Sequence, residues 1–128
     1  MTMKLNKNLL NKSDIESILE PTLLWENSSP NSSFSGGTNA ITLNQSVSNF
    51  KYIAIEYVAK IGLYLMSETR KYRVESNNTG FTLFYYKDWY RDFALTDNGI
   101  TVGHATNNSS NTDDDWLVPR RIYGTNIL

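Results

Sequence analysis

The sequence predicts a mainly β protein, an antiparallel β-sandwich of jelly-roll type preceded by a short N-terminal helix. From residue 22 onward apolar residues recur with a period of two, which is the spacing of strands. Clusters rich in Asn, Ser and Thr interrupt these runs at near-regular intervals, as loops between short strands do. A parallel sheet is disfavoured because the chain after residue 21 offers no helical crossover.

Residues 1–21 are expected to form an arm, and residues 22–128 the β domain. Ser13-Asp-Ile-Glu16 matches a helix capping box, and Pro21 ends the helix that follows. A helix of about two turns is too short to be stable alone, so it must dock on another surface. Its apolar residues, with the leucines just before it, are Leu9, Leu10, Ile15, Ile18 and Leu19. They either pack on the β domain or serve attachment and oligomerisation.

About nine candidate strands follow the arm. Leu23–Trp25 and Ala40–Leu43 come first. Phe50–Ala59 is almost wholly apolar, β-branched or aromatic, so we expect a central strand that is covered on both faces. Gly62–Ser67 is expected to be its hairpin partner.

Two hairpins are predicted in the second half. The first pairs Lys71–Glu75 with Gly80–Tyr86 through the Asn-rich turn between them. The second pairs Trp89–Thr96 with Ile100–His104 through Asp97-Asn-Gly99, where the glycine is expected to adopt the left-handed conformation. The segment from Trp116 to Tyr123 supplies the closing strand.

Composition limits the partners. The 128 residues suit one domain, and 12 basic against 13 acidic residues leave a net charge of -1, which argues against nucleic acid and anionic lipid. The chain has no cysteine, so it folds without disulfides. No N-terminal apolar run resembles a signal peptide, and no run is long enough for a membrane helix. We expect a non-secreted protein without a membrane partner.

The sequence holds no arrangement typical of an enzyme. Glu56 and Asp92 could meet as a glycosidase pair, but their spacing does not indicate that they do. The acidic run Asp113–Asp115 lacks the alternating ligands of a calcium loop, so we expect a solvated loop. His104 has no second histidine or cysteine with which to bind a transition metal. We therefore expect no catalytic residue, no metal and no cofactor.

Aromatic residues are dense between Phe81 and Phe93, and strand alternation cannot send all of them into one core. The candidate ligand or interface residues are Tyr85, Tyr86, Trp89 and Tyr90, which lie among the charged residues Lys87, Asp88, Arg91 and Asp92. Amphipathic rings in such a setting suit a subunit contact, half-buried packing, or a platform for a sugar. The sequence leaves these three alternatives open.

Four segments resemble a module of tailed-bacteriophage and prophage structural proteins. They are Leu24-Trp-Glu-Asn27 with Ser29-Pro30 and Phe34, Ile41–Leu43, Phe50–Tyr57, and Val118-Pro-Arg-Arg-Ile-Tyr-Gly124. The resemblance covers about Leu23 to Gly124 and departs from the module in the loop 107–115. Trp25 and Tyr123 are expected to lie in adjacent strands and to contribute to the core.

The resemblance implies a component of a tail fibre, baseplate or head fibre, made in the bacterial cytoplasm and located in the virion. It also implies a homo-oligomer, with a trimer favoured, that contacts other virion proteins and takes part in attachment to the host surface, where a glycan is a possible receptor. The alternative is a stand-alone carbohydrate-binding module that uses its surface aromatics. A small glycan-active hydrolase is the third hypothesis.

Overall fold

The protein is mainly β. The structure, a computed structural model, describes residues 11–12, 20–36, 39–61, 67–74, 80–86, 89–106 and 114–127. Within these residues the strands are β1 (Thr22–Glu26), β2 (Asn39–Thr42), β3 (Tyr52–Lys60), β4 (Ser67–Arg73), β5 (Gly80–Tyr86), β6 (Trp89–Leu95), β7 (Gly99–Thr106) and β8 (Trp116–Thr125). A short 3-10 helix, η1 (Val47–Asn49), lies between β2 and β3.

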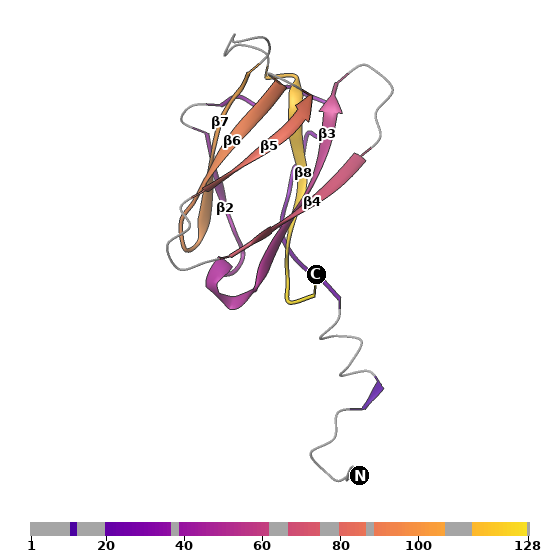
Figure 1. The fold of residues 1–128 in the computed structure, drawn as a ribbon, viewed down its shortest axis with the longest axis vertical. Coiled ribbons are helices and arrows are strands. Elements are labelled where there is room, and N and C mark those ends of the chain that lie inside the picture. The colour runs from indigo at the N-terminus through magenta and orange to yellow at the C-terminus, as the bar shows by residue number, and fades with distance from the viewer. Residues whose placement is uncertain are drawn as a thin grey trace.

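The strands form two antiparallel sheets of four strands each, in the orders β1-β8-β3-β4 and β2-β7-β6-β5. The chain crosses from one sheet to the other after β1, β2, β4 and β7. Figure 1 shows β4 of the first sheet beside β5 of the second, where the Tyr72 and Phe81 rings stack with centroids 4.2 Å apart. The first and last strands, β1 and β8, are direct neighbours.

The two sheets share one apolar core. Side chains alternate between the faces of a strand, and the inward-facing positions of both sheets hold the buried residues. They include Leu24, Ile55 and Ile122 from the first sheet and Leu83, Phe93 and Val102 from the second, each at most 2% exposed. Because both sheets bury side chains in the same core, each stabilises the other.

Strand β3 confirms the expected central strand. It lies between β8 and β4, and its core-facing residues alternate with Ala54 and Val58, which are 3% and 1% exposed. Both faces of β3 are therefore covered at these positions. Its β-branched and aromatic composition follows from this environment, since such side chains pack well on a pleated surface.

One of the two pairings predicted between residues 62 and 86 is wrong. β3 pairs with β4, which begins at Ser67 opposite Val58; the rest of Gly62–Ser67, the partner predicted for β3, lies outside the described part of the chain. The predicted hairpin between Lys71–Glu75 and Gly80–Tyr86 does not form, because β4 pairs with β3 while β5 pairs with β6 in the other sheet. The two segments meet through side chains across the core and not through a shared ladder.

The hairpin of β6 and β7 is confirmed, but the role expected for its glycine is wrong. The Thr96 amide donates to the carbonyl of Gly99 at 2.9 Å, which closes the turn. The φ angle of Gly99 lies outside the left-handed region. A Cβ atom there would lie 3.0 Å from the Ile41 carbonyl oxygen, so the close approach of β2 favours glycine.

The predictions for the N-terminal arm concern residues outside the described part of the chain. These are the helix predicted after Ser13 and the attachment residues Leu9, Leu10, Ile15, Ile18 and Leu19. The boundary at residue 21 stays a prediction, although β1 does begin at Thr22. Among the described residues no helix has the length and apolar character needed to cross a bilayer.

Candidate ligand-binding face

The four predicted aromatic site residues do not form one cluster that the structure describes. The side chains of Tyr85 and Tyr86 in β5 lie outside the described part. Trp89 and Tyr90 are consecutive in β6, so their rings have different neighbours: Trp89 contacts Trp116, and Tyr90 contacts Phe84. The two predicted residues that can be placed therefore have different roles.

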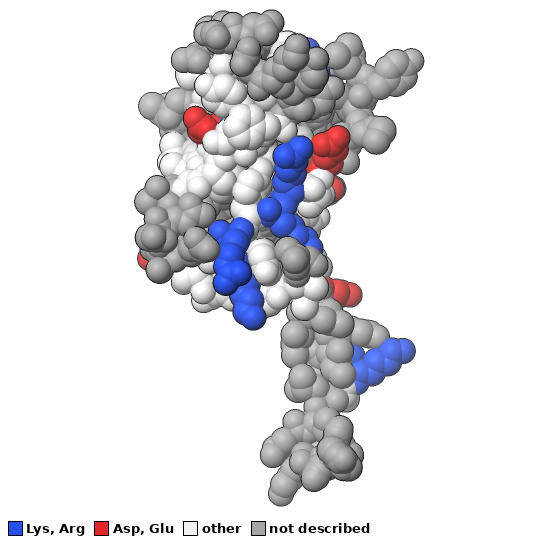
Figure 2. Space-filling model, in the orientation of Figure 1, with Lys and Arg blue, Asp and Glu red and all other residues white. Residues whose placement is uncertain are grey.

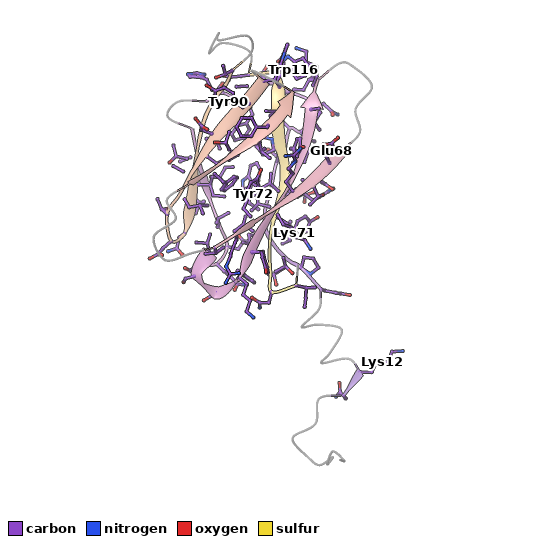
Figure 3. The ribbon with its side chains drawn as sticks, viewed as in Figure 1. Lys12, Glu68, Lys71, Tyr72, Tyr90 and Trp116 are labelled. Carbon is purple, nitrogen blue, oxygen red and sulfur yellow. The ribbon has the colours of Figure 1, made fainter. Side chains whose placement is uncertain are left out.

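Trp89 packs between the sheets. Its ring centroid lies 3.8 Å from that of Trp116 in β8, and the Lys60 ammonium lies 5.5 Å from the centroid of the Trp116 ring. Figure 3 shows Trp116 at the end of the molecule where β3 ends and β8 begins. Both tryptophans are half-buried. For Trp89 the structure therefore favours the packing alternative over a ligand platform.

Tyr90 belongs to the outer face of the second sheet. The register of β5 and β6 pairs Phe84 with Tyr90 and Thr82 with Asp92. These residues alternate with the core residues Leu83 and Phe93, so they point away from the core. The Phe84 side chain is 51% exposed, with its centroid 5.8 Å from that of Tyr90.

A shallow open groove of about 480 Å³ lies on this face. It is lined by Gly80, Phe81, Thr82, Asp92, Phe93, Ala94, Thr101 and Gly103. The outward-facing residues at its floor are small. Gly80 of β5 lies opposite Ala94 of β6, and Ala94 also pairs with Thr101 of β7. Gly80 must stay without a side chain, since a Cβ atom would lie 2.4 Å from the Phe93 carbonyl oxygen.

Asp92 is the charged group of the groove. Its Oδ1 accepts a hydrogen bond from the Thr82 hydroxyl at 2.6 Å. Asp92 is exposed, and no described lysine or arginine lies within ion-pair distance of it. The exposed cations Arg70, Lys71 and Arg73 belong to β4 of the other sheet. Figure 2 shows lysine and arginine side chains in blue over the region of β4.

Behind the groove, Arg91 is fully buried. Alternation along β6 turns it inward while Asp92 points outward. Its Nε donates to the carbonyl of Gly103 at 2.8 Å, and Nη1 donates to Trp116 and Leu117. Its Nη2 donates to the carbonyl of Phe34 and to Asp114 Oδ1, the latter at 3.1 Å. This cluster fixes Gly103, one of the groove residues.

Asp114 completes the buried pair. Its Oδ1 accepts from the amide of Ala105 at 3.0 Å, and its Oδ2 from the amide of Gly36 at 3.1 Å. Burial alone would raise its pKa, but these amides, the hydrogen bond with His104 and the charge of Arg91 together lower it. Burial lowers the pKa of Arg91 to about 10, so Arg91 is still charged at neutral pH.

The pair of Arg91 and Asp114 corrects two expectations. Arg91 was expected among surface charges, and the aspartate run was expected to be a solvated loop. The Asp114 side chain is only 17% exposed, and Asp115 accepts from the Ser33 hydroxyl and lies 3.5 Å from the Lys60 ammonium. Asp113 lies outside the described residues. Where side chains are described, no group of three potential metal ligands occurs. The His104 ring forms a hydrogen bond with the Asp114 carboxylate.

The acidic pair considered for hydrolysis is not brought together. Glu56 lies in the first sheet, where it accepts from Arg121 Nη1 at 2.6 Å, while Arg121 Nε donates to Glu26 at 2.9 Å. Asp92 lies in the second sheet and binds Thr82. The two carboxylates thus have different partners on different sheets.

Two residues of this face were missed as candidates, Thr82 in the groove and Phe84 beside it, and Asp92 was considered only as half of a hydrolytic pair. Alternation carried a usable signal, because Leu83 and Phe93 as inward residues force their neighbours outward. The missing information was the register of β5 against β6, which places Phe84 beside Tyr90.

No family model matches this chain, and no curated protein is significantly similar to it.

Proposed function

We propose that this chain is a structural component of the bacteriophage virion, in a fibre, baseplate or head-decoration element, with a role in attachment to the host surface. The observation that carries the proposal is the meeting of the segments on which the resemblance rests. The opening Leu24-Trp-Glu-Asn27 and the closing Pro119-Arg-Arg-Ile-Tyr-Gly124 lie far apart in the sequence but pair as β1 and β8.

The contacts between these segments use the residues of the motif. Asn27 donates from Nδ2 to the carbonyl of Pro119 and from its backbone amide to the carbonyl of Arg120, both at 2.8 Å. A Cβ atom on Gly124 would lie 2.4 Å from the ring of Phe50, so the glycine makes room for that ring. Residues of one motif segment thus contact residues of another, which supports the proposal that the segments belong to one module.

One of the two large aromatic residues of the motif supports the same proposal. Trp25 is half-buried, packs against the core and meets Phe34 edge to face with centroids 5.9 Å apart. The expectation that Tyr123 contributes to the core is wrong: it alternates with the core residue Ile122 and pairs with Leu23, so its half-buried ring faces away from the core. The finer fold belongs to the proposal as well: a jelly-roll-like sandwich, supported by the nested pairs β1–β8 and β2–β7.

The test is the protein content of purified particles. Virions induced from the encoding strain should contain this chain at a fixed ratio to the capsid protein, and an antibody against it should label them and reduce adsorption. The purified chain should sediment as a homo-oligomer, with a trimer expected. Its presence in the lysate but absence from washed particles would overturn the proposal.

A stand-alone carbohydrate-binding module is the second candidate. The open groove beside the exposed Phe84 ring favours it, because exposed apolar surface next to hydrogen-bonding groups is typical of a binding site. This alternative predicts that the isolated monomer binds glycans and that no particle contains the chain. Sedimentation and particle composition therefore separate the two candidates.

A further inference from the structure

The groove on the outer face of β5, β6 and β7 combines two chemical features. Its carboxylate, Asp92, has one oxygen engaged by Thr82. An ionised carboxylate has about four lone-pair sites and only accepts, so Asp92 retains capacity for donors from a ligand. The hydroxyls of Thr82 and Thr101 line the same groove and can both donate and accept.

The second feature is a pair of aromatic rings beside the groove. Phe84 and Tyr90 do not line it, but they form the outward cross-strand pair next to Thr82 and Asp92 along the two strands. Phe84 is one of only a few large apolar residues that are exposed among the described residues. The floor of the groove is low because Gly80 and Ala94 project little, so a flat ligand that extends toward Phe84 could contact both this ring and the carboxylate.

We propose that this groove binds a neutral glycan, an inference that rests on the attachment function proposed above. A sugar ring offers an apolar face for Phe84 and hydroxyl donors for Asp92 on one ligand. The negative charge of Asp92, with no described cation beside it, disfavours sialylated, sulfated or phosphorylated glycans through like-charge repulsion. Asp92 and Phe84 are thus the residues that determine specificity.

The full chain should be tested on an array of neutral oligosaccharides that carries their sulfated and sialylated forms alongside. We expect binding to neutral members only. Asp92→Ala and Phe84→Ala should each weaken it at least about 10-fold, because a ligand hydroxyl or a ring face loses its partner. Asp92→Asn should restore part of the affinity and reduce the discrimination against acidic members.

Matched controls lie elsewhere on the chain. Asp97→Ala removes an exposed carboxylate in the turn between β6 and β7, and Leu23→Ala removes an apolar side chain that is 41% exposed in β1. Both should bind as the wild type does. Circular dichroism of each variant establishes that it is folded before its binding is interpreted.

Two outcomes would overturn the inference: no glycan binding by the wild type, or binding of acidic glycans that equals or exceeds that of neutral ones. Incorporation of Asp92→Ala into particles separates this failure from that of the proposed function. Normal incorporation without glycan binding refutes the groove alone. Glycan binding by a chain that is absent from particles refutes the virion role alone.

Discussion

Arg91 joins three parts of the chain through one side chain. Its guanidinium donates to carbonyls of the loop before β2, of β7 and of β8, as well as to Asp114. A buried charge is tolerated only when it is paired and its donors are satisfied, and here Asp114 and the three carbonyls provide both. At the scale of single residues, Arg91 is therefore the position where a substitution should cost most.

Arg91→Met should lower the free energy of unfolding by about 3–5 kcal/mol, because Asp114 and several carbonyls lose their donor inside the protein. Urea denaturation followed by tryptophan fluorescence measures the change. Arg121→Met is the control: this partly exposed arginine links Glu26 and Glu56, and because solvent screens such pairs its loss should cost much less than the loss of Arg91. Equal costs for the two variants would contradict the structural role of Arg91.

Asp114 gives an acid limb to the stability profile. Its pKa is lowered below the ordinary value of an aspartate, so its stabilisation is complete above about pH 5 and is lost as pH falls through the folded pKa. We expect the free energy of unfolding of the wild type to fall over that range more steeply than that of Asp114→Asn. Asp97→Asn should keep the wild-type slope. Parallel profiles for wild type and Asp114→Asn would exclude the assignment.

At the scale of elements, the ladder between β3 and β4 carries a buried phenol. The Tyr57 hydroxyl donates to Glu68 Oε2 at 2.7 Å. Burial, as the larger cause, and this hydrogen bond together raise the pKa of Tyr57 to about 12. A raised pKa means that the stabilisation is complete below pH 10 and is lost as pH rises toward 12.

Tyr57→Phe should cost about 1 kcal/mol at neutral pH and should flatten the alkaline loss of stability, because it removes the titrating hydroxyl. Denaturation midpoints at pH 7, 9 and 11 test this. Tyr123→Phe serves as the control, since the Tyr123 hydroxyl makes no hydrogen bond within the described part of the chain. An unchanged alkaline limb in Tyr57→Phe would disprove the assignment.

The elements also show where sequence reasoning succeeds and fails. The hairpin of β6 and β7 was predictable because Asp97-Asn-Gly99 is a local turn signal between two alternating runs. The cluster at 76–79 looks equally like a hairpin turn, yet β4 and β5 lie in different sheets. The local sequence indicates that the chain turns at this point. The sheet that the next strand joins depends instead on contacts across the core, such as that between Tyr72 and Phe81.

The candidate site was predictable to a similar extent. Aromatic density pointed to β5 and β6, the strands of the proposed groove, and Tyr90 lies on their outer face next to Phe84. Asp92 was considered as a charged neighbour of the aromatics and as a partner of Glu56, but not as part of a groove, because that depends on which residues of β5 lie opposite. Arg91 was misplaced because charge usually indicates exposure, although its spacing from Phe93 and Leu95 already put it on the inward face.

At the scale of the whole molecule, a single core predicts a single unfolding transition. Ile122 in the first sheet and Leu83 in the second are both fully buried in it. Ile122→Ala and Leu83→Ala should each cost about 2–5 kcal/mol, and in each variant fluorescence and far-ultraviolet circular dichroism should report the same midpoint. Two separated midpoints would show that the sheets unfold independently.

The pairing of β1 with β8 also determines how the domain responds to force. Thr22 lies opposite Gly124, so the chain enters and leaves the β structure at one pole. Tension applied between the two ends would peel β1 from β8 one backbone hydrogen bond at a time, which is the weakest direction of loading for a ladder. If the domain has to resist pulling, it would therefore be attached through one terminus only. The opposing force would then act on the face of the other sheet.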